Sequence, residues 1–335
     1  FPFFLLAQDT LQTRTQVLMG TFVDITLSQE NNQEITKSFA LLKRIEDSLS
    51  TYNPQATLAK LNATHHVPSD TYLSEAIKLS KMYYDESNGY FDITIGSISK
   101  KLYHFGEGKT YSPSKHALQN AYLNIDGIHM DDHSIRTDKN ITIDLGGMGK
   151  GYGVDKVSKY LKEQNITEGI VALSGDIRCL NPCEIYLQSP YSEQTFAKIN
   201  SKYPSLSIST SGTYRRYANT KDEHHLINPK TTSQGREFVS VSLFTTANNA
   251  KIDAYATAIS VMPKDKALTF LKDHKDVGFV IIDNQGKIFY GNITGLVDIE
   301  WLNYNEKPTI PSIHKNNNTN SNIDTSLIHP DTSNP

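Results

Sequence analysis

A glycine-rich segment that contains one lysine is the strongest candidate for chemistry in this chain. Residues 141–155 read ITIDLGGMGKGYGVD, with five glycines set between a strand pattern and a helix pattern. Glycines let backbone N–H groups approach an anion, and the positive end of a following helix favours phosphate. The segment fits neither a P-loop, because Asp144 and Gly151 occupy two required positions, nor a dinucleotide fingerprint, because Tyr152 replaces its third glycine. It indicates either another type of phosphate site or a turn that packs closely.

Two further groups of residues have the right types for chemistry. Asp253 and Thr257 are four residues apart, so a helix places their oxygens on one face, where they suit Mg²⁺. An Asp and a Thr at this spacing are more commonly a helix cap or a hydrogen-bonded pair. His225 precedes a short Leu-Ile-Asn-Pro turn and could either exchange protons near neutral pH or hydrogen-bond a loop.

The composition limits the class of protein. The 335 residues are 38% hydrophobic, and 33 basic against 36 acidic residues give a net charge of −3. No segment is rich in Lys and Arg, which argues against a nucleic-acid partner. No apolar run reaches the length of a bilayer-spanning helix, so we expect no membrane span in the folded body.

The amino end and the cysteines bear on the compartment. Residues 1–7 read FPFFLLA and resemble the end of a signal peptide, although an ordinary first strand fits as well. Cys179 and Cys183 flank Leu-Asn-Pro, so they could form a disulfide across a turn in an oxidising compartment or remain two buried thiols. A zinc site is a weaker prediction, because the spacing is CxxxC and the sequence has no second pair of cysteines.

The apolar periodicity predicts an α+β fold, with mixed sheets flanked by helices. Val23, Ile25 and Leu27 alternate as in a strand, and a helical stripe follows from Ile35 to Leu49. A second helix should start after an Asp70 N-cap and bury Leu73, Ile77 and Met82. Later helices are predicted after the glycine turn and at 252–261 and 264–272, and strands at 169–173, 184–188, 206–209, 239–244, 277–282 and 287–290.

The length and composition also predict the domain organisation. Residues 11–302 should form the folded body, as one large domain or two intimately joined subdomains, and 1–10 an amino-terminal arm or the remnant of a signal peptide. Residues 303–335 are rich in Asn, Ser, Thr and Pro, a composition typical of a disordered tail.

Seven motifs occur together in one order. They are MGT at 19–21, STYNP at 50–54, GYFDITIG at 89–96, DLGGMGKGYGVD at 144–155, SGDI at 174–177, HHLINP at 224–229 and DAYATA at 253–258. In this combination the chain resembles the FAD:protein FMN transferases, also called ApbE-type flavin transferases. The resemblance extends from Met19 to about Met262.

The resemblance implies an activity and a set of site residues. Members of that family use Mg²⁺ to transfer FMN from FAD to a threonine hydroxyl of a recipient protein, and release AMP. The resemblance assigns the metal to Asp253, Thr257 and the main-chain oxygen of Gly147, and proton transfer to His225 or Asp253. It assigns FAD, bound between the subdomains, to Met19, Tyr52, Tyr90, Phe91, Asp92, Asp144, Lys150 and Ile227.

The resemblance also implies partners and a compartment. Its recipients are flavin-carrying subunits of redox-driven membrane complexes or other exported flavoproteins. We therefore expect a periplasmic or exported enzyme, with attachment to the inner membrane as one arrangement.

Three positions depart from the family pattern. Ser174 precedes Gly175-Asp176 where GGD is usual, Asn228 replaces an aspartate, and Thr232 lies where a glycine commonly follows. These changes keep two other readings open, a Mg²⁺-dependent FAD pyrophosphatase that gives FMN and AMP, and a non-catalytic periplasmic flavin-binding module.

Overall fold

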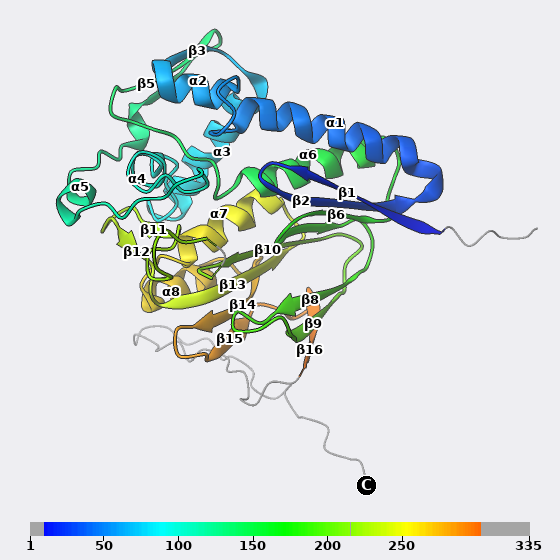
Figure 1. Cartoon of the computed structure of the whole chain (residues 1–335). Coiled ribbons are helices and arrows are strands. Elements are labelled where there is room, and N and C mark those ends of the chain that lie inside the picture. The colour runs from blue at the N-terminus through cyan, green and yellow to red at the C-terminus, as the bar shows by residue number, and fades with distance from the viewer. Residues whose placement is uncertain (1–9, 215, 303–335) are drawn as a thin grey trace, which may run out of the picture.

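An eight-stranded antiparallel sheet forms the centre of the fold in the computed structural model, which describes residues 10–214 and 216–302 (Figure 1). Its strand order is β1-β2-β6-β7-β10-β13-β14-β15. The strands are β1 (Leu11–Leu18), β2 (Thr21–Ser28), β6 (Ile170–Leu173), β7 (Asp176–Cys179), β10 (Leu206–Gly212), β13 (Phe238–Thr245), β14 (Gly278–Asp283) and β15 (Ile288–Gly291). Antiparallel pairing throughout brings strands from both halves of the sequence side by side in the middle of the sheet.

The two faces of this sheet belong to two hydrophobic cores. In β14, Phe279 and Ile281 pack into the core on the helical side, whereas Val280 and Ile282 pack into the core on the opposite side. Successive side chains of a strand point to opposite faces, so an uninterrupted apolar strand of this kind is one covered on both sides.

Helices cover one face, and a small sheet covers the other (Figure 1). The helical layer contains α1 (Asn32–Leu49), α2 (Thr57–Thr64), α3 (Thr71–Glu86), α6 (Gly149–Glu163), α7 (Asn249–Ile259) and α8 (Lys264–Asp273). The opposite layer is the sheet of β8 (Glu184–Gln188), β9 (Thr195–Ser201) and β16 (Val297–Trp301). A third sheet of β3 (His66–Pro68), β5 (Ser134–Thr137) and β4 (Ile128–Met130) packs beside α2. Short elements complete the body: α4 (Gly96–Ser99), α5 (Lys115–Gln119), β11 (Ile227–Asn228) and β12 (Ser233–Gln234).

These layers confirm the α+β prediction, and α3 shows where the sequence reading was right and where it was wrong. Asp70 caps α3 as expected, because its carboxylate accepts a hydrogen bond from the Leu73 N–H at 2.8 Å. Met82, expected inside, is 45% exposed, and Tyr83 is buried in its place. Five residues at about 100° each put Met82 some 140° away from Ile77, whereas Tyr83 lies on the stripe.

The remaining expectations divide into those that the structure settles and those that it does not. Cys179 and Cys183 form a disulfide between the end of β7 and the start of β8. Within residues 10–214 and 216–302, no helix combines the length and apolar character that a bilayer crossing requires. The predicted tail at 303–335 and residues 1–9 of the predicted arm lie outside the described residues, and the division into two subdomains stays a prediction.

Candidate active site

The glycine turn is fastened to the GYFDITIG segment before it enters α6. The Asp144 N–H donates to the Ile93 carbonyl at 2.8 Å, and Ile95 pairs with Thr142 as a parallel bridge. After residues 145–148, α6 begins at Gly149, so the N–H groups of its first turn have no partner within the helix. Two of the seven motifs are thus joined directly by backbone contacts.

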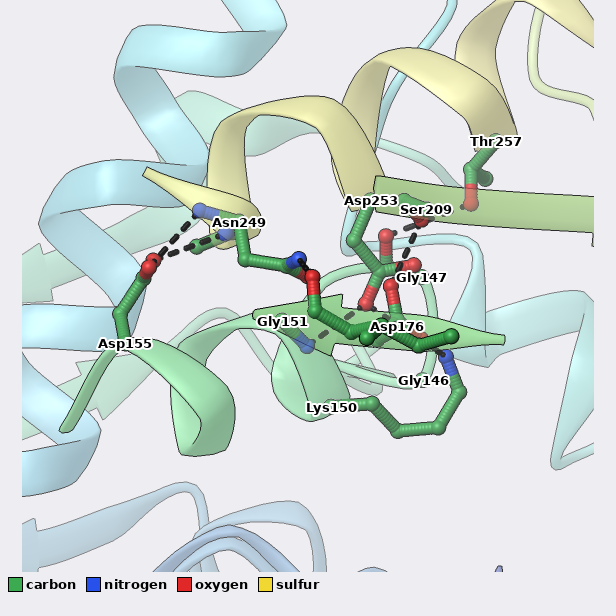
Figure 2. A network of polar contacts seen from close by, with 12 residues as sticks. Gly146, Gly147, Lys150, Gly151, Asp155, Asp176, Ser209, Asn249, Asp253 and Thr257 are labelled. Carbon is green, nitrogen blue, oxygen red and sulfur yellow. Dashed lines mark hydrogen bonds and ion pairs between the residues drawn. The ribbon is translucent and has the colours of Figure 1, made fainter. Parts of the chain in front are cut away.

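The carbonyl of this turn meets the helix that carries the predicted metal ligands (Figure 2). The Thr257 hydroxyl donates to the Gly147 carbonyl oxygen at 3.2 Å, and Asp253 Oδ2 accepts a hydrogen bond from the Gly151 N–H at 3.0 Å. Asp253 and Thr257 lie one helical turn apart on the same side of α7. The structure therefore brings the three predicted metal-ligating residues to one place.

Two glycines allow this close approach. A Cβ on Gly151 would lie 2.7 Å from the Asn249 carbonyl oxygen and 2.9 Å from the Ala250 Cα, so only glycine lets α6 contact the backbone of α7 here. A Cβ on Gly147 would lie 3.0 Å from Thr257 Oγ1. The glycines therefore serve packing as well as any approach of a phosphate.

A lysine separates two buried carboxylates beside the turn. Asp176 on β7 is fully buried and Asp253 is 2% exposed. The Lys150 ammonium forms an ion pair with Asp176 and lies 3.5 Å from Asp253 Oδ2 (Figure 2). The other oxygen of Asp176 accepts a hydrogen bond from the Ser209 hydroxyl at 2.6 Å. Buried charges require such compensation, because desolvation disfavours each of them.

The protonation of Asp253 is displaced far from its ordinary range. Burial, together with the nearby Asp176 carboxylate, raises the pKa of Asp253 to about 7, although Lys150 and the Gly151 N–H act against the shift. Burial by itself would lower the pKa of Lys150, but the two carboxylates outweigh that effect and raise the pKa. At neutral pH the ammonium is therefore charged, and Asp253 is poised between its two forms.

These oxygens fit a hard divalent cation. Asp253 Oδ1 accepts no hydrogen bond from any described residue, and the Gly147 carbonyl and Thr257 hydroxyl supply two neutral oxygens next to it. No group of three or more His, Cys, Asp or Glu residues in the described chain is arranged to hold a metal. The site therefore suits Mg²⁺ shared with phosphate oxygens better than a metal bound entirely by protein.

The beginning of α7 is held by a separate set of contacts. Asp155 of α6 accepts hydrogen bonds from the N–H groups of Asn249 and Ala250 at 2.7 and 2.9 Å (Figure 2). The Asn249 amide donates to the carbonyls of Ile177 and Ile208, on two strands of the large sheet. The helix that carries Asp253 is thereby fixed to both α6 and the sheet.

Tyr52 and Asp144, two predicted flavin residues, share a lysine. The Lys100 ammonium lies 2.6 Å from the Tyr52 hydroxyl oxygen and 3.7 Å from Asp144 Oδ2. Asp144 also accepts from the Ser99 hydroxyl at 2.7 Å and the Gly146 N–H at 2.9 Å. Burial would raise the pKa of Asp144, but Lys100 and these donors lower it, so the carboxylate is ionised. Its principal contacts are with the protein, and it shapes the turn.

Tyr90, Phe91 and Asp92 take different positions although they are neighbours. Phe91 is buried beside Gly147, since a Cβ there would lie 3.2 Å from its ring. Tyr90 is half-buried, with the Lys230 ammonium 4.9 Å from its ring centre. Asp92 accepts hydrogen bonds from the Thr94 N–H and hydroxyl, both at 2.7 Å, and burial raises its pKa. Of the two aromatic rings, that of Tyr90 has more surface left for a ligand than that of Phe91.

Met19 and Ile227 pack against different parts of the protein. Met19 occupies a two-residue turn between β1 and β2 with φ of 53°, and its sulfur lies 3.0 Å from the Cβ position of Gly153 in α6. Ile227 begins β11 and is buried in a small cluster with Ile98 and Phe105. Met19 thus approaches the helix of the glycine turn, whereas Ile227 supports the loop around Tyr52.

His225 is half-buried and neutral at physiological pH. The surrounding protein shields the imidazole from water, and this desolvation lowers its pKa to about 4. The cations of Arg216 and Lys150 act in the same direction. Its Nδ1 lies 3.1 Å from the Arg216 carbonyl, an acceptor, so this contact needs the proton on Nδ1. The lone pair is then on Nε2, which could accept a proton.

The three departures from the family pattern have visible structural consequences. Asn228 donates through its amide to the Val261 carbonyl at 2.9 Å, which an ionised aspartate could not do, and its side-chain oxygen accepts from the Lys230 N–H. Ser174 and Thr232 adopt φ of 57° and 56°, the left-handed region that favours glycine. The family's glycines are therefore replaced at two positions where the backbone still has the conformation of a glycine turn.

Sequence reasoning gave no role to Asp176, Ser209 or Lys100. Asp176 belongs to the SGDI motif and is charged at the start of a buried strand, which was a usable signal. Ser209 and Lys100 carry no such signal, because their importance comes from partners that are 33 and 48 residues away in the sequence.

Comparison with known proteins agrees with this fold. The model of the ApbE family matches residues 19–281, and the chain belongs to that family.

Its curated relatives are named FAD:protein FMN transferase. The protein from Haemophilus influenzae is 25% identical over 281 residues, which cover 76% of this chain and 79% of the relative. The Vibrio cholerae protein is 27% identical, with 75% of this chain and 81% of the relative covered.

Solved structures share the fold. The ApbE protein of Thermotoga maritima matches with a TM-score of 0.76 and 24% identity, over 83% of this chain and 96% of that one. The flavin transferase ApbE of Vibrio cholerae matches with a TM-score of 0.74 and 22% identity, over 86% and 99%.

Proposed function

We propose that this chain is a Mg²⁺-dependent enzyme that transfers FMN from FAD to a threonine hydroxyl of a recipient protein and releases AMP. The observation that carries the proposal is the convergence of Asp253, Thr257 and the Gly147 carbonyl beside the glycine turn at the start of α6. Family membership and the names of the relatives support the same activity.

The reaction exchanges the phosphoanhydride bond of FAD for a phosphoester bond to threonine. The threonine oxygen forms a bond to the FMN phosphorus, the bond from that phosphorus to the bridging oxygen breaks, and AMP leaves with that oxygen. Bound Mg²⁺ would neutralise charge that develops on the diphosphate oxygens. Asp253, Thr257 and the Gly147 carbonyl would hold the cation, while the positive end of the α6 dipole beside the glycine turn would favour and orient the phosphates.

Lys150 and His225 have distinct tasks in this proposal. Lys150 keeps the two buried carboxylates compensated and carries the nearest fixed positive charge for the diphosphate. Neutral His225, with its lone pair on Nε2, would accept the proton that the threonine hydroxyl loses. Asp253 is the alternative acceptor, because its carboxylate lies beside the same turn.

The aromatic residues and the compartment complete the proposal. Half-buried Tyr90 and exposed Tyr52 would cover the flat rings of FAD. A disulfide between Cys179 and Cys183 supports work in an oxidising compartment, either the periplasm or outside the cell. The recipients that we propose are flavin-carrying subunits of redox-driven membrane complexes.

One experiment separates transfer from its nearest alternative. The protein is incubated with FAD, Mg²⁺ and a recipient flavoprotein domain, and intact-mass measurement follows the recipient while chromatography follows AMP. Transfer adds the mass of one FMN to the recipient for each AMP released. Free FMN and AMP without a mass gain would show an FAD pyrophosphatase, and FAD binding without AMP would show a storage module.

Variants test the metal assignment. Asp253→Asn keeps the side chain's size, so we expect it to fold and bind FAD but to lose AMP release by at least about 100-fold. Asp132→Ala, an exposed loop carboxylate, is the matched control and should leave the rate unchanged. A rate in Asp253→Asn equal to that of the control would reject the assignment.

A further inference from the structure

A cavity lies on the outer flank of α6, away from the glycine turn. It has a volume of about 670 Å³ and is lined by α3, α6, the end of β7, residues 203–205 and the loop before α7. No residue assigned to the flavin or metal site lines it. Its volume is in the range of pockets that hold small organic ligands.

The wall of this cavity carries an excess of positive charge. Four cations line it, against the carboxylates of Glu75 and Asp155: they are Lys156, Lys159, Lys162 and Arg178. Both carboxylates are engaged, since Glu75 binds Lys156 and the Tyr152 hydroxyl, and Asp155 caps α7. Within the described chain, neither Lys162 nor Arg178 forms an ion pair.

Arg178 is the most distinctive of these cations. It is partly buried, and both of its hydrogen bonds use Nη1, one to the Ser207 hydroxyl and one to the Ala247 carbonyl at 2.5 Å. A guanidinium has five N–H donors, so Nε and both N–H groups of Nη2 have no acceptor among the described residues. The Asp155 carboxylate acts on Arg178 electrostatically, but its two oxygens accept hydrogen bonds from the N–H groups of Asn249 and Ala250, and it forms no ion pair with the guanidinium. An anionic ligand in the cavity would give the remaining N–H groups of Arg178 their acceptors.

We propose that this cavity binds a small organic phosphate. Arg178 and Lys162 would bind the phosphate, because a planar guanidinium donates paired hydrogen bonds to phosphate oxygens and an ammonium adds a point charge. Leu79, Leu180 and Tyr203 line the same cavity and would pack against an apolar or planar body. This site is additional to the one proposed for FAD.

The cavity shares its walls with elements of the active site. Asp155 lines the cavity and caps α7, the helix that carries Asp253, and Arg178 lies two residues after Asp176 on β7. A ligand there would stabilise the position of α7 relative to α6. Binding at the cavity would therefore strengthen the arrangement of the metal ligands from behind.

Binding is tested with phenyl phosphate as the probe, by isothermal titration calorimetry on the full chain saturated with FAD in EDTA. Inorganic phosphate lacks the planar body and phenol lacks the anion. We expect one site for phenyl phosphate, binding at least about 10-fold weaker for inorganic phosphate, and none for phenol. Equal binding of phosphate and phenyl phosphate, or competition between FAD and the probe, would overturn the proposal.

Two variants locate the site. Lys162→Gln removes an exposed helical charge and should weaken phenyl phosphate at least about threefold, whereas Arg178→Gln should weaken it at least about tenfold. Lys266→Gln removes an exposed lysine from α8 and is the matched control, with unchanged binding. Arg178 also holds the loop before α7, so Lys162→Gln keeps the test valid if Arg178→Gln fails to fold. Unchanged affinity in Lys162→Gln would refute the site.

Discussion

Replacing Gly151 by alanine tests whether the contact between α6 and α7 sets the geometry of the metal site. The new Cβ would lie 2.7 Å from the Asn249 carbonyl oxygen and 2.9 Å from the Ala250 Cα, both of them backbone atoms. Neither can rotate away, so the helices must separate by about 0.7 Å, from 2.7 Å to the 3.4 Å of ordinary contact. The Gly151 N–H donates a hydrogen bond to Asp253, so the separation acts on a proposed metal ligand.

The size of the effect follows from two opposing contributions. Overpacking of this kind costs about 1–3 kcal/mol of unfolding free energy, and alanine in a helix returns at most about 1 kcal/mol relative to glycine. We expect a net loss of up to about 2 kcal/mol, which lowers the melting temperature by up to about 3 °C in a chain of this size. A displacement approaching 1 Å at a metal ligand can reduce the reaction rate by about 100-fold.

Gly149→Ala is the matched control for stability, because it adds the same methyl group two residues earlier in α6. A Cβ at Gly149 has nothing within 4 Å. We would record melting curves for wild type, Gly151→Ala and Gly149→Ala. For wild type and Gly151→Ala we would also measure the Mg²⁺ concentration that gives half-maximal AMP release. The reasoning is refuted if Gly151→Ala melts with wild type and requires the same Mg²⁺ concentration.

Three further predictions concern charge and backbone strain. Lys150→Met leaves the buried carboxylates of Asp176 and Asp253 uncompensated, so we expect a loss of about 3 kcal/mol in unfolding free energy, partly restored by Mg²⁺ in melting experiments. Burial raises the pKa of Asp253 from 3.8 to about 7, so the stability gained from its protonation is full below pH 3.8 and is lost as the pH rises toward 7. Mg²⁺ requires the ionised carboxylate of Asp253, so its binding should weaken about tenfold for each pH unit below 7. Mg²⁺ titrations of Asp253→Asn should not show this pH dependence. Thr232→Gly relieves a left-handed β-branched residue and should raise the unfolding free energy by about 1 kcal/mol in denaturant titrations, and an unchanged midpoint would count against strain there.

Much of the fold could be predicted from the sequence because most elements bury one clear stripe. The helix from Asn32 to Leu49 and the strand from Glu184 to Gln188 were both anticipated, through their apolar periodicity and their turn signals. β1 was missed, because this edge strand is mostly exposed and its residues alternate without a buried apolar face. Edge strands are specified by their partner, and that partner is visible only in the folded sheet.

The site was predictable to the extent that its chemistry is local. The spacing of Asp253 and Thr257 indicated a shared helix face, and the structure places both against the glycine turn. The sequence could not predict that Asp144 accepts a hydrogen bond from Ser99 and pairs with Lys100, because those contacts join segments about 45 residues apart. A carboxylate in a ligand-binding motif can thus be engaged mainly in shaping the protein around the ligand.

The charge balance of the buried site connects the metal prediction to the pH prediction. Asp176 and Asp253 contribute two negative charges, whereas Lys150 contributes one positive charge. One negative charge remains in a desolvated place, and this raises the pKa of Asp253 to about 7, so a proton can balance the charge. A divalent cation at the same carboxylate would remove the need for that proton and leave one positive charge facing a bound diphosphate. Proton and Mg²⁺ therefore compete for Asp253, so lowering the pH and withholding the metal should reduce activity through the same residue.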